Sequence, residues 1–154
     1  MKVNQHQAPL NILLADDDID DRFFFDKALE ELPINAQLNT VNNGEQLMDY
    51  LAENTDHLPD VLFLDLSMPR KTGFECLAEI KENIKLKDLP VIMFTTSFTR
   101  GTDFEDNLKN TLLRMGAQDY IRKPGDFEEL KKIIQQVLVR FTEKENTTQK
   151  ENNL

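Results

Sequence analysis

Acidic residues follow two apolar runs of the sequence, at the point where each run ends. Asp16 and Asp17 come directly after Leu10–Ala15, and Asp65 comes directly after Val61–Leu64. An unbroken apolar run of this length, bounded by turn residues, is typical of a strand buried on both faces of a parallel sheet. In open α/β sheets, ligands bind at the carboxyl edge of the strands. These carboxylates are therefore candidate nucleophiles or metal ligands.

Two more polar side chains occur at later strand ends. Thr95 closes the apolar run Leu89–Phe94, and Lys123 follows a short strand expected over Gln118–Arg122. Taken alone, Thr95 fits an ordinary strand-end hydroxyl, Lys123 a surface charge, and Asp65 a helix cap. The carboxyl ends of parallel strands lie at one edge of a sheet, however, so these residues should converge. Their joint placement predicts a cluster of three carboxylates, one hydroxyl and one ammonium group.

This set of groups suits the transfer of a phosphoryl group to an aspartate. Neighbouring carboxylates repel one another unless a cation compensates them, and Mg²⁺ is typically held by one or two carboxylates together with water and phosphate. Aspartate is the nucleophile in enzymes that pass through an aspartyl phosphate. An ammonium and a hydroxyl suit the phosphoryl oxygens, because phosphoryl transfer depends mainly on positioning and charge neutralisation. The cluster therefore predicts a phosphoryl-accepting aspartate with Mg²⁺ as its cofactor.

The elements that must position these residues alternate along the chain. Strands are expected at Leu10–Ala15, Ala36–Val41, Val61–Leu64, Leu89–Phe94 and Gln118–Arg122. Helices are expected at Ile19–Leu32, Glu45–Ala52, Phe74–Ile84, Phe104–Met115 and Phe127–Phe141. A fivefold strand–helix alternation implies an α/β fold with one parallel sheet, helices on both faces and right-handed crossovers.

Length and composition limit the class of protein. The 154 residues fit one domain, which we place at 9–142 between a polar leader (1–8) and a polar, disordered tail (143–154). The net charge of −10 argues against nucleic-acid or anionic membrane partners, which require clustered Lys and Arg. No signal peptide or membrane span is evident, and Cys76, the single cysteine, is expected to be a small buried residue. These features favour a cytoplasmic protein.

Four motifs in order resemble the receiver domain of bacterial response regulators, of the single-domain type seen in chemotaxis regulators. The motifs are Leu13–Asp18, Leu64–Pro69 with Gly73, Met93–Thr96 and Tyr120–Pro124. Each motif is weak alone, but all four lie at strand ends and together they extend over nearly the whole chain. The resemblance implies a flavodoxin-like, doubly wound, five-stranded parallel sheet of order 2-1-3-4-5.

The resemblance also implies a role for each acidic residue. Asp65 would accept the phosphoryl group from a histidine kinase or a histidine phosphotransfer protein. Asp17 and Asp65, with the backbone carbonyl of Ser67, would bind Mg²⁺, and Asp16 would act on the metal largely through bound water. Loss of the phosphoryl group would be slow and self-catalysed, so the protein would be a phosphorelay component and not an enzyme.

Three residues are implied in signalling. Lys123 would pair with Asp65 and then with the phosphoryl oxygens, and its bond to Pro124 would be cis. Thr95 would move to bond the phosphoryl group, and Tyr120 would follow it from an outward to an inward rotamer. The two-component signal would then leave through phosphorylation-dependent binding of a downstream protein, with the chain a monomer or a phosphorylation-linked dimer.

One segment departs from the family pattern. Between Thr95 and Gly116 the chain is longer by about half a dozen residues, against the short βα loops usual in such folds. The extra residues lie near Phe98 to Asp106, where the family's switch face begins, and we expect a polar loop there. The sequence does not identify the role of this segment.

Two alternatives remain open. A haloacid-dehalogenase-type phosphatase also uses a strand-end Asp and Mg²⁺, but Asp16–Asp20 lacks the Thr or Val of its D-x-D-x-T/V signature. A pseudo-receiver adaptor would keep the fold without phosphorylation, and the full acidic set argues against it. A calcium-binding loop is excluded, because its sixth position is Asp21 and not Gly, and its twelfth is Lys27 and not Glu.

Overall fold

The computed structural model describes the backbone of residues 8–96 and 101–152, and the side chains of residues 8–96 and 103–142. Within these ranges, strands and helices alternate in the following order: β1 (Leu10–Ala15), α1 (Ile19–Glu30), β2 (Ala36–Val41), α2 (Gly44–Glu53), β3 (Val61–Leu64), α3 (Gly73–Glu82), β4 (Val91–Thr95), α4 (Gly101–Arg114), β5 (Asp119–Arg122) and α5 (Phe127–Asn152). All strand pairs are parallel, and the sheet order is β2-β1-β3-β4-β5. The predicted flavodoxin-like, doubly wound fold is confirmed.

The register of the strands aligns their carboxyl ends. Ala15 of β1 pairs with Leu64 of β3, and Thr95 of β4 pairs with Arg122 of β5. Three of the strands, β1, β3 and β5, are each followed directly by a residue that lies at this edge of the sheet. These residues are Asp16, Asp65 and Lys123.

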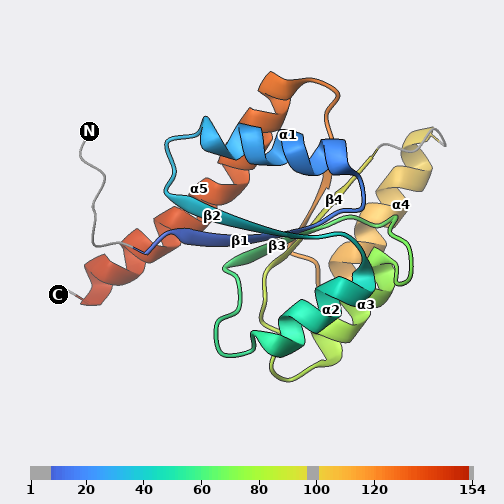
Figure 1. Cartoon of the computed structure of the whole chain (residues 1–154), viewed down its shortest axis with the longest axis horizontal. Coiled ribbons are helices and arrows are strands. Elements are labelled where there is room, and N and C mark those ends of the chain that lie inside the picture. Colours follow the sequence, from blue (N-terminus) through green and yellow to red (C-terminus); the bar gives the residue numbers. More distant parts are fainter. Residues whose placement is uncertain (1–7, 97–100, 153–154) are drawn as a thin grey trace.

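Two helical layers cover the sheet, with α1 and α5 on one face and α2, α3 and α4 on the other (Figure 1). Successive side chains of β1 point to opposite faces of the sheet, as the period of a strand requires. Ile12 and Leu14 pack in the core beneath α1 and α5, whereas Leu13 and Ala15 pack in the core beneath α2 and α3. This explains why the central strands are apolar at consecutive positions.

Three aromatic rings anchor α1 to the centre of the sheet. Phe25 of α1 lies edge-to-face against Phe63 of β3 and Phe94 of β4, with ring centroids 5.0 and 5.9 Å away. Phe63 and Phe94 are also in edge-to-face contact, at 5.9 Å. Because edge-to-face pairs add to the free energy gained by burial alone, this cluster fixes α1 relative to the strand ends.

The helices differ from their expected bounds by one or two residues at their ends, and two of them, α4 and α5, differ by more. α4 begins at Gly101 rather than near Phe104, so the segment expected to be a loop is helical from Gly101 onward, and 97–100 lie outside the described residues. α5 extends to Asn152, whereas we expected it to end near Phe141. The stretch 143–152 contains no Gly or Pro to stop a helix. The division of the chain at residue 142 stays a prediction, and the leader expected at 1–8 lies outside the described residues except for Ala8.

Two expectations about Cys76 and about membrane-spanning segments can be compared with the structure. The Cys76 thiol is buried against the Gly44 carbonyl oxygen, with the sulfur 3.6 Å away, as expected for a small core residue. Burial raises the pKa of this thiol to about 12. Within the described part of the chain, no helix is long and apolar enough to cross a membrane.

The aromatic cluster leads to a test of stability. Phe25→Ala should lower the free energy of unfolding by about 3–5 kcal/mol, because it removes a fully buried ring. The control is Phe23→Ala on the same helix, whose ring is 54% exposed and should cost less than about 1 kcal/mol. Urea unfolding followed by far-UV circular dichroism would measure both. Equal losses in the two variants would contradict the assigned core.

Candidate functional site

Three carboxylates converge at the carboxyl edge of the sheet. Asp16, Asp17 and Asp65 each place a carboxylate oxygen within 4.8 Å of the others. Asp16 and Asp65 are only 1% and 6% exposed, whereas Asp17 is exposed to solvent. The structure therefore brings together the acidic residues singled out in the sequence, with one of them open to an incoming ion.

Backbone hydrogen bonds hold these residues just beyond the strands. The Asp16 N–H donates to the Val41 carbonyl at 3.1 Å, and the Asp65 N–H donates to the Ala15 carbonyl at 3.0 Å, so the sheet ladder continues by one residue. The side chain of Asp18 caps α1 by accepting from two backbone N–H groups of its first turn. The turn from β1 into α1 is thereby fixed, and the cluster is built on rigid elements.

A close approach of backbone fixes the loop after β3. The Gly73 N–H donates to the Leu66 carbonyl at 2.9 Å, and a Cβ on Gly73 would lie 2.2 Å from the Asp65 carbonyl oxygen. Only glycine fits this position without moving the end of β3. The Ser67 N–H points at the Asp65 carboxylate, 3.4 Å from Oδ1. The predicted use of the Ser67 carbonyl as a metal ligand stays a prediction.

Lys123 makes ion pairs with three carboxylates. Its Nζ lies 2.5 Å from Asp16 Oδ2, 2.9 Å from Asp21 Oδ2 and 3.5 Å from Asp65 Oδ2. Asp21 is a contact that the sequence analysis missed, since Asp21 was considered there only as a position of a calcium-binding loop. The signal was available, because a helix that begins at Ile19 places Asp21 in its first turn, beside the end of β1.

The ionisable groups of the cluster perturb one another. Burial raises the pKa of Asp16 to about 6 even though Lys123 favours its ionised form. Burial likewise raises the pKa of Asp65, again opposed by Lys123. For Lys123, burial favours the neutral form, but the neighbouring carboxylates raise its pKa overall. One ammonium does not balance the negative charge of this cluster, so the donor set fits a hard divalent cation with oxygen ligands.

Thr95 is buried beside the cluster. Its side chain is 0% exposed, and Oγ1 has no hydrogen-bond partner among the described residues. The hydroxyl nevertheless lies near enough to Asp65 to help lower the pKa of that carboxyl. A buried hydroxyl at this position is available to donate to an oxygen beside Asp65.

Tyr120 is buried at 8% exposure, and its expected change from an outward to an inward rotamer stays a prediction. Its hydroxyl donates to Glu105 Oε1 on α4 at 3.4 Å. Burial raises the pKa of the Tyr120 hydroxyl, and Glu105 adds to this effect. Glu105 also forms an ion pair of 3.0 Å with Arg122 of β5. The sequence analysis did not identify Glu105, because only the packing of α4 against β5 brings it to Tyr120.

The expected cis bond between Lys123 and Pro124 is wrong for this structure. Among the described residues no peptide bond is cis. The Lys123 N–H donates to the Thr95 carbonyl at 2.7 Å, and the side chain reaches the carboxylates with the bond trans.

Comparisons with known proteins agree on one family. The family model described as "Response regulator receiver domain" matches residues 12–135. The response regulator Rcp1 of Synechocystis sp. (strain PCC 6803) is 29% identical over 136 residues, covering 86% of this chain and 88% of that protein.

Two solved structures have the same architecture. The phosphorylated cyanobacterial phytochrome response regulator RcpA superposes with a TM-score of 0.72 at 30% identity, covering 84% of this chain and 91% of that one. The Mn²⁺-bound form of Rcp1 gives a TM-score of 0.70 at 28% identity, with the same coverage of 84% and 91%. A receiver with a divalent ion bound, together with the acidic cluster described above, supports divalent metal binding.

The cluster predicts how metal should affect stability. Mg²⁺ at 100 times its dissociation constant should raise the free energy of unfolding of the unaltered protein by about 2.7 kcal/mol. Asp17→Asn should unfold at no lower temperature than the unaltered protein without Mg²⁺, because it relieves repulsion, and should lose most of the rise with Mg²⁺. The control Asp26→Asn, an exposed residue of α1, should keep that rise. Thermal unfolding with and without Mg²⁺ measures these shifts, and an unaltered protein indifferent to Mg²⁺ would rule out the metal site.

Proposed function

The chain belongs to the response regulator receiver domain family, and from that premise we propose that Asp65 accepts a phosphoryl group whose presence controls binding to another protein. One observation carries the proposal. The Asp65 carboxylate lies at the end of the central strand with the Lys123 ammonium 3.5 Å away, two further carboxylates beside it and the partnerless Thr95 hydroxyl close by. The solved phosphorylated form of RcpA supports the same chemistry.

Each residue of the cluster would have its own role in phosphoryl transfer. A carboxylate oxygen of Asp65 forms a bond to phosphorus, while the bond between phosphorus and a histidine nitrogen of the donor breaks. Lys123 and the Thr95 hydroxyl are placed to neutralise and orient the phosphoryl oxygens. Asp17, Asp65 and the Ser67 carbonyl would hold Mg²⁺, with Asp16 acting largely through bound water. The ion would supply the positive charge that the carboxylates and the phosphoryl group require.

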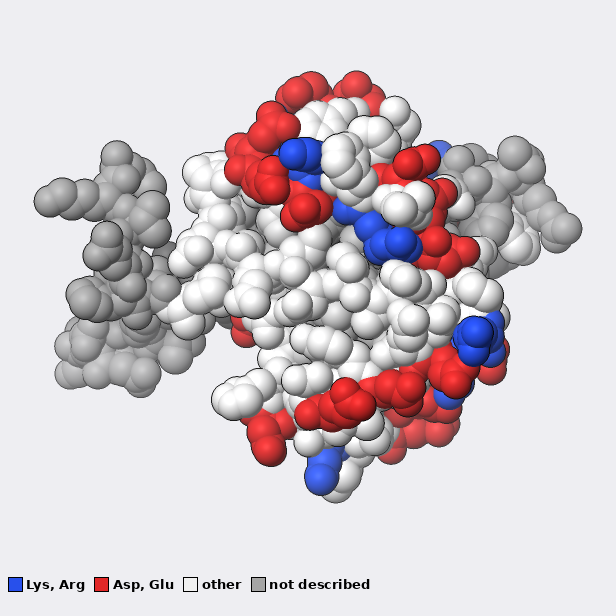
Figure 2. Space-filling view, in the orientation of Figure 1, with Lys and Arg blue, Asp and Glu red and all other residues white. Residues whose placement is uncertain are grey.

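The phosphoryl donor we propose is a histidine kinase or a histidine phosphotransfer protein, and the output is a downstream protein. Acidic side chains gather over α1 and α5 and over α2 on the face shown in Figure 2, with several Lys and Arg among the upper group, and the chain as a whole has a net charge of −10. Such a face would repel the phosphates of nucleic acids and anionic membranes. We place the protein in the cytoplasm as a monomer or phosphorylation-linked dimer, with the receiver at 9–142.

The two alternatives are less well supported. The family match extends over most of the chain and favours a receiver over a haloacid-dehalogenase-type phosphatase. The intact set of Asp16, Asp17, Asp65 and Lys123 favours phosphoryl acceptance over a pseudo-receiver adaptor. The function we propose is self-catalysed phosphoryl acceptance followed by slow loss, without turnover of a small-molecule substrate.

Phosphoryl acceptance can be measured directly. Acetyl phosphate with Mg²⁺ should add one phosphoryl group to the unaltered protein and none to Asp65→Asn, since the variant lacks the nucleophilic carboxylate. Asp49→Asn, an exposed residue of α2, should be modified normally. Intact-mass spectrometry provides the readout. An equal mass gain in Asp65→Asn would mean that another residue is the acceptor, and no gain in any form would support the pseudo-receiver.

A second test addresses how the signal reaches α4. Beryllofluoride with Mg²⁺ should change amide exchange in α4, because Thr95 would turn towards the phosphoryl mimic and disturb the Tyr120–Glu105 contact. Thr95→Ala should reduce this change while Asp65 still takes up phosphate. The control Thr96→Ala removes a neighbouring exposed hydroxyl and should leave the change intact. Identical exchange with and without the mimic would place the output surface elsewhere.

A further inference from the structure

We propose that Asp21 is a positioning residue, a displaceable counter-ion for Lys123 that sets how tightly a phosphoryl group is held at Asp65. The inference rests on the proposed function of Asp65. Asp21 lies outside the group of three carboxylates that converge on the candidate metal position. Its Oδ2 approaches the Lys123 ammonium to 2.9 Å, closer than the 3.5 Å between that ammonium and Asp65. In the structure, Lys123 is therefore bound more closely to Asp21 than to the proposed acceptor.

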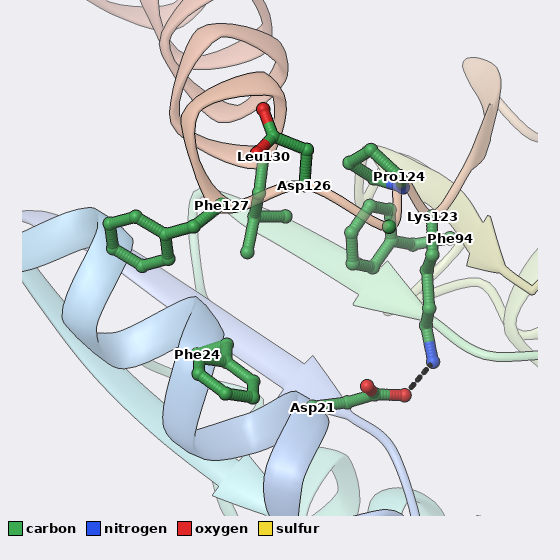
Figure 3. A pocket seen from close by; sticks show the side chains of 9 residues that line it. Asp21, Phe24, Phe94, Lys123, Pro124, Asp126, Phe127 and Leu130 are labelled. Carbon is green, nitrogen blue, oxygen red and sulfur yellow. Dashed lines mark hydrogen bonds and ion pairs between the residues drawn. The ribbon is translucent and has the colours of Figure 1, made fainter.

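The location of Asp21 separates it from the rest of the site. The carboxylate projects from the first turn of α1 towards the end of the Lys123 side chain, on the border of a small cavity (Figure 3). This cavity of about 170 Å³ lies between α1, the end of β4 and the start of α5, and is lined mainly by apolar groups. Phe94 flanks the ammonium, with its ring centroid 5.7 Å from Nζ. Asp126 also lines the cavity, but its carboxylate accepts from the Glu129 N–H in the first turn of α5.

The three partners of Lys123 differ in the cost of release. The Asp16 side chain is 1% exposed and that of Asp65 is 8% exposed, so either carboxylate would lose a buried counter-ion without regaining water. The Asp21 side chain is 35% exposed and can be rehydrated when Lys123 leaves it. Asp21 is therefore the partner that Lys123 can give up at the lowest cost.

A phosphoryl group on Asp65 would draw Lys123 away from Asp21. An ammonium has three N–H donors, and in the structure three carboxylates already occupy its surroundings. Additional oxygens with negative charge at Asp65 must compete with Asp21 for the same donors, and Asp21 also repels them. Both effects have the same sign, so Asp21 lowers the affinity of the site for a phosphoryl group.

Asp20 provides a matched control. It occupies the same first turn of α1 and carries the same charge, but it is exposed and only its backbone N–H takes part in the Asp18 cap. Replacing it with Asn removes one negative charge from the helix N-terminus without changing the surroundings of Lys123. The comparison therefore separates direct contact from the general effect of charge.

The test is a titration of beryllofluoride at saturating Mg²⁺, followed by backbone amide NMR on the full chain. Asp21→Asn should bind beryllofluoride about three- to tenfold more tightly than the unaltered protein, in line with the net contribution of one ordinary hydrogen bond at a partly exposed site. Asp20→Asn should change the affinity by less than about twofold. Asp21→Glu, which restores the carboxylate, should return the affinity towards that of the unaltered protein, and it remains informative if Asp21→Asn folds poorly.

The outcomes separate this inference from the proposed function. If Asp21→Asn binds beryllofluoride no more tightly than Asp20→Asn does, the role of Asp21 as a competitor would be overturned. The assignment of Asp65 as the acceptor would not be affected. If Asp21→Glu binds beryllofluoride as tightly as Asp21→Asn does, the role of Asp21 as a competitor would also be overturned. If the unaltered protein does not bind beryllofluoride at all, the proposed phosphoryl site itself is wrong.

Discussion

The site depends on one buried ammonium group. Lys123 is 8% exposed and lies between Asp16 and Asp65, which directly follow β1 and β3, and Asp21 of the first turn of α1. Removing a charge from water is costly, and a buried ion pair is tolerated only where several hydrogen bonds repay that cost. Lys123 makes the approach of the carboxylates possible but does not balance their charge. A divalent ion or a phosphoryl group would therefore change the balance of the whole cluster, which is what a switch requires.

Lys123 also connects the acidic cluster to the ends of β4 and β5, and β5 contacts α4. Its backbone N–H donates to the Thr95 carbonyl, and Thr95 pairs in register with Arg122, the residue before Lys123. Arg122 and Tyr120 both contact Glu105 on α4. A rearrangement at the ends of β4 and β5 would therefore reach α4 through two polar contacts at one carboxylate. Few groups and no long path separate the cluster from α4, so a coupling of the kind proposed above would need only a local two-state change.

The strands were well defined by local patterns. Consecutive apolar residues with turn residues on either side predicted β1 and β3 to the residue, because a strand buried on both faces admits few polar positions. Helix ends were less accurate, as for α4 and α5, because helix termini depend on caps and on packing that a periodic pattern does not specify. The meeting of Asp16, Asp65 and Lys123 also followed from the sequence, because the strand alternation implies a parallel sheet whose strand ends share one edge.

Tertiary structure alone decided how the side chains pair. Asp21 meets Lys123 across 102 positions of the chain, and Glu105 meets Tyr120 only because α4 packs against β5. The burial of Tyr120 has the same origin. The residue types and the order of the strands by themselves determined the family, the sheet and the acidic cluster. The contacts of Lys123 with particular carboxylates and of Tyr120 with α4 depend on distances of a few ångströms between elements. No local pattern in the sequence encodes such distances.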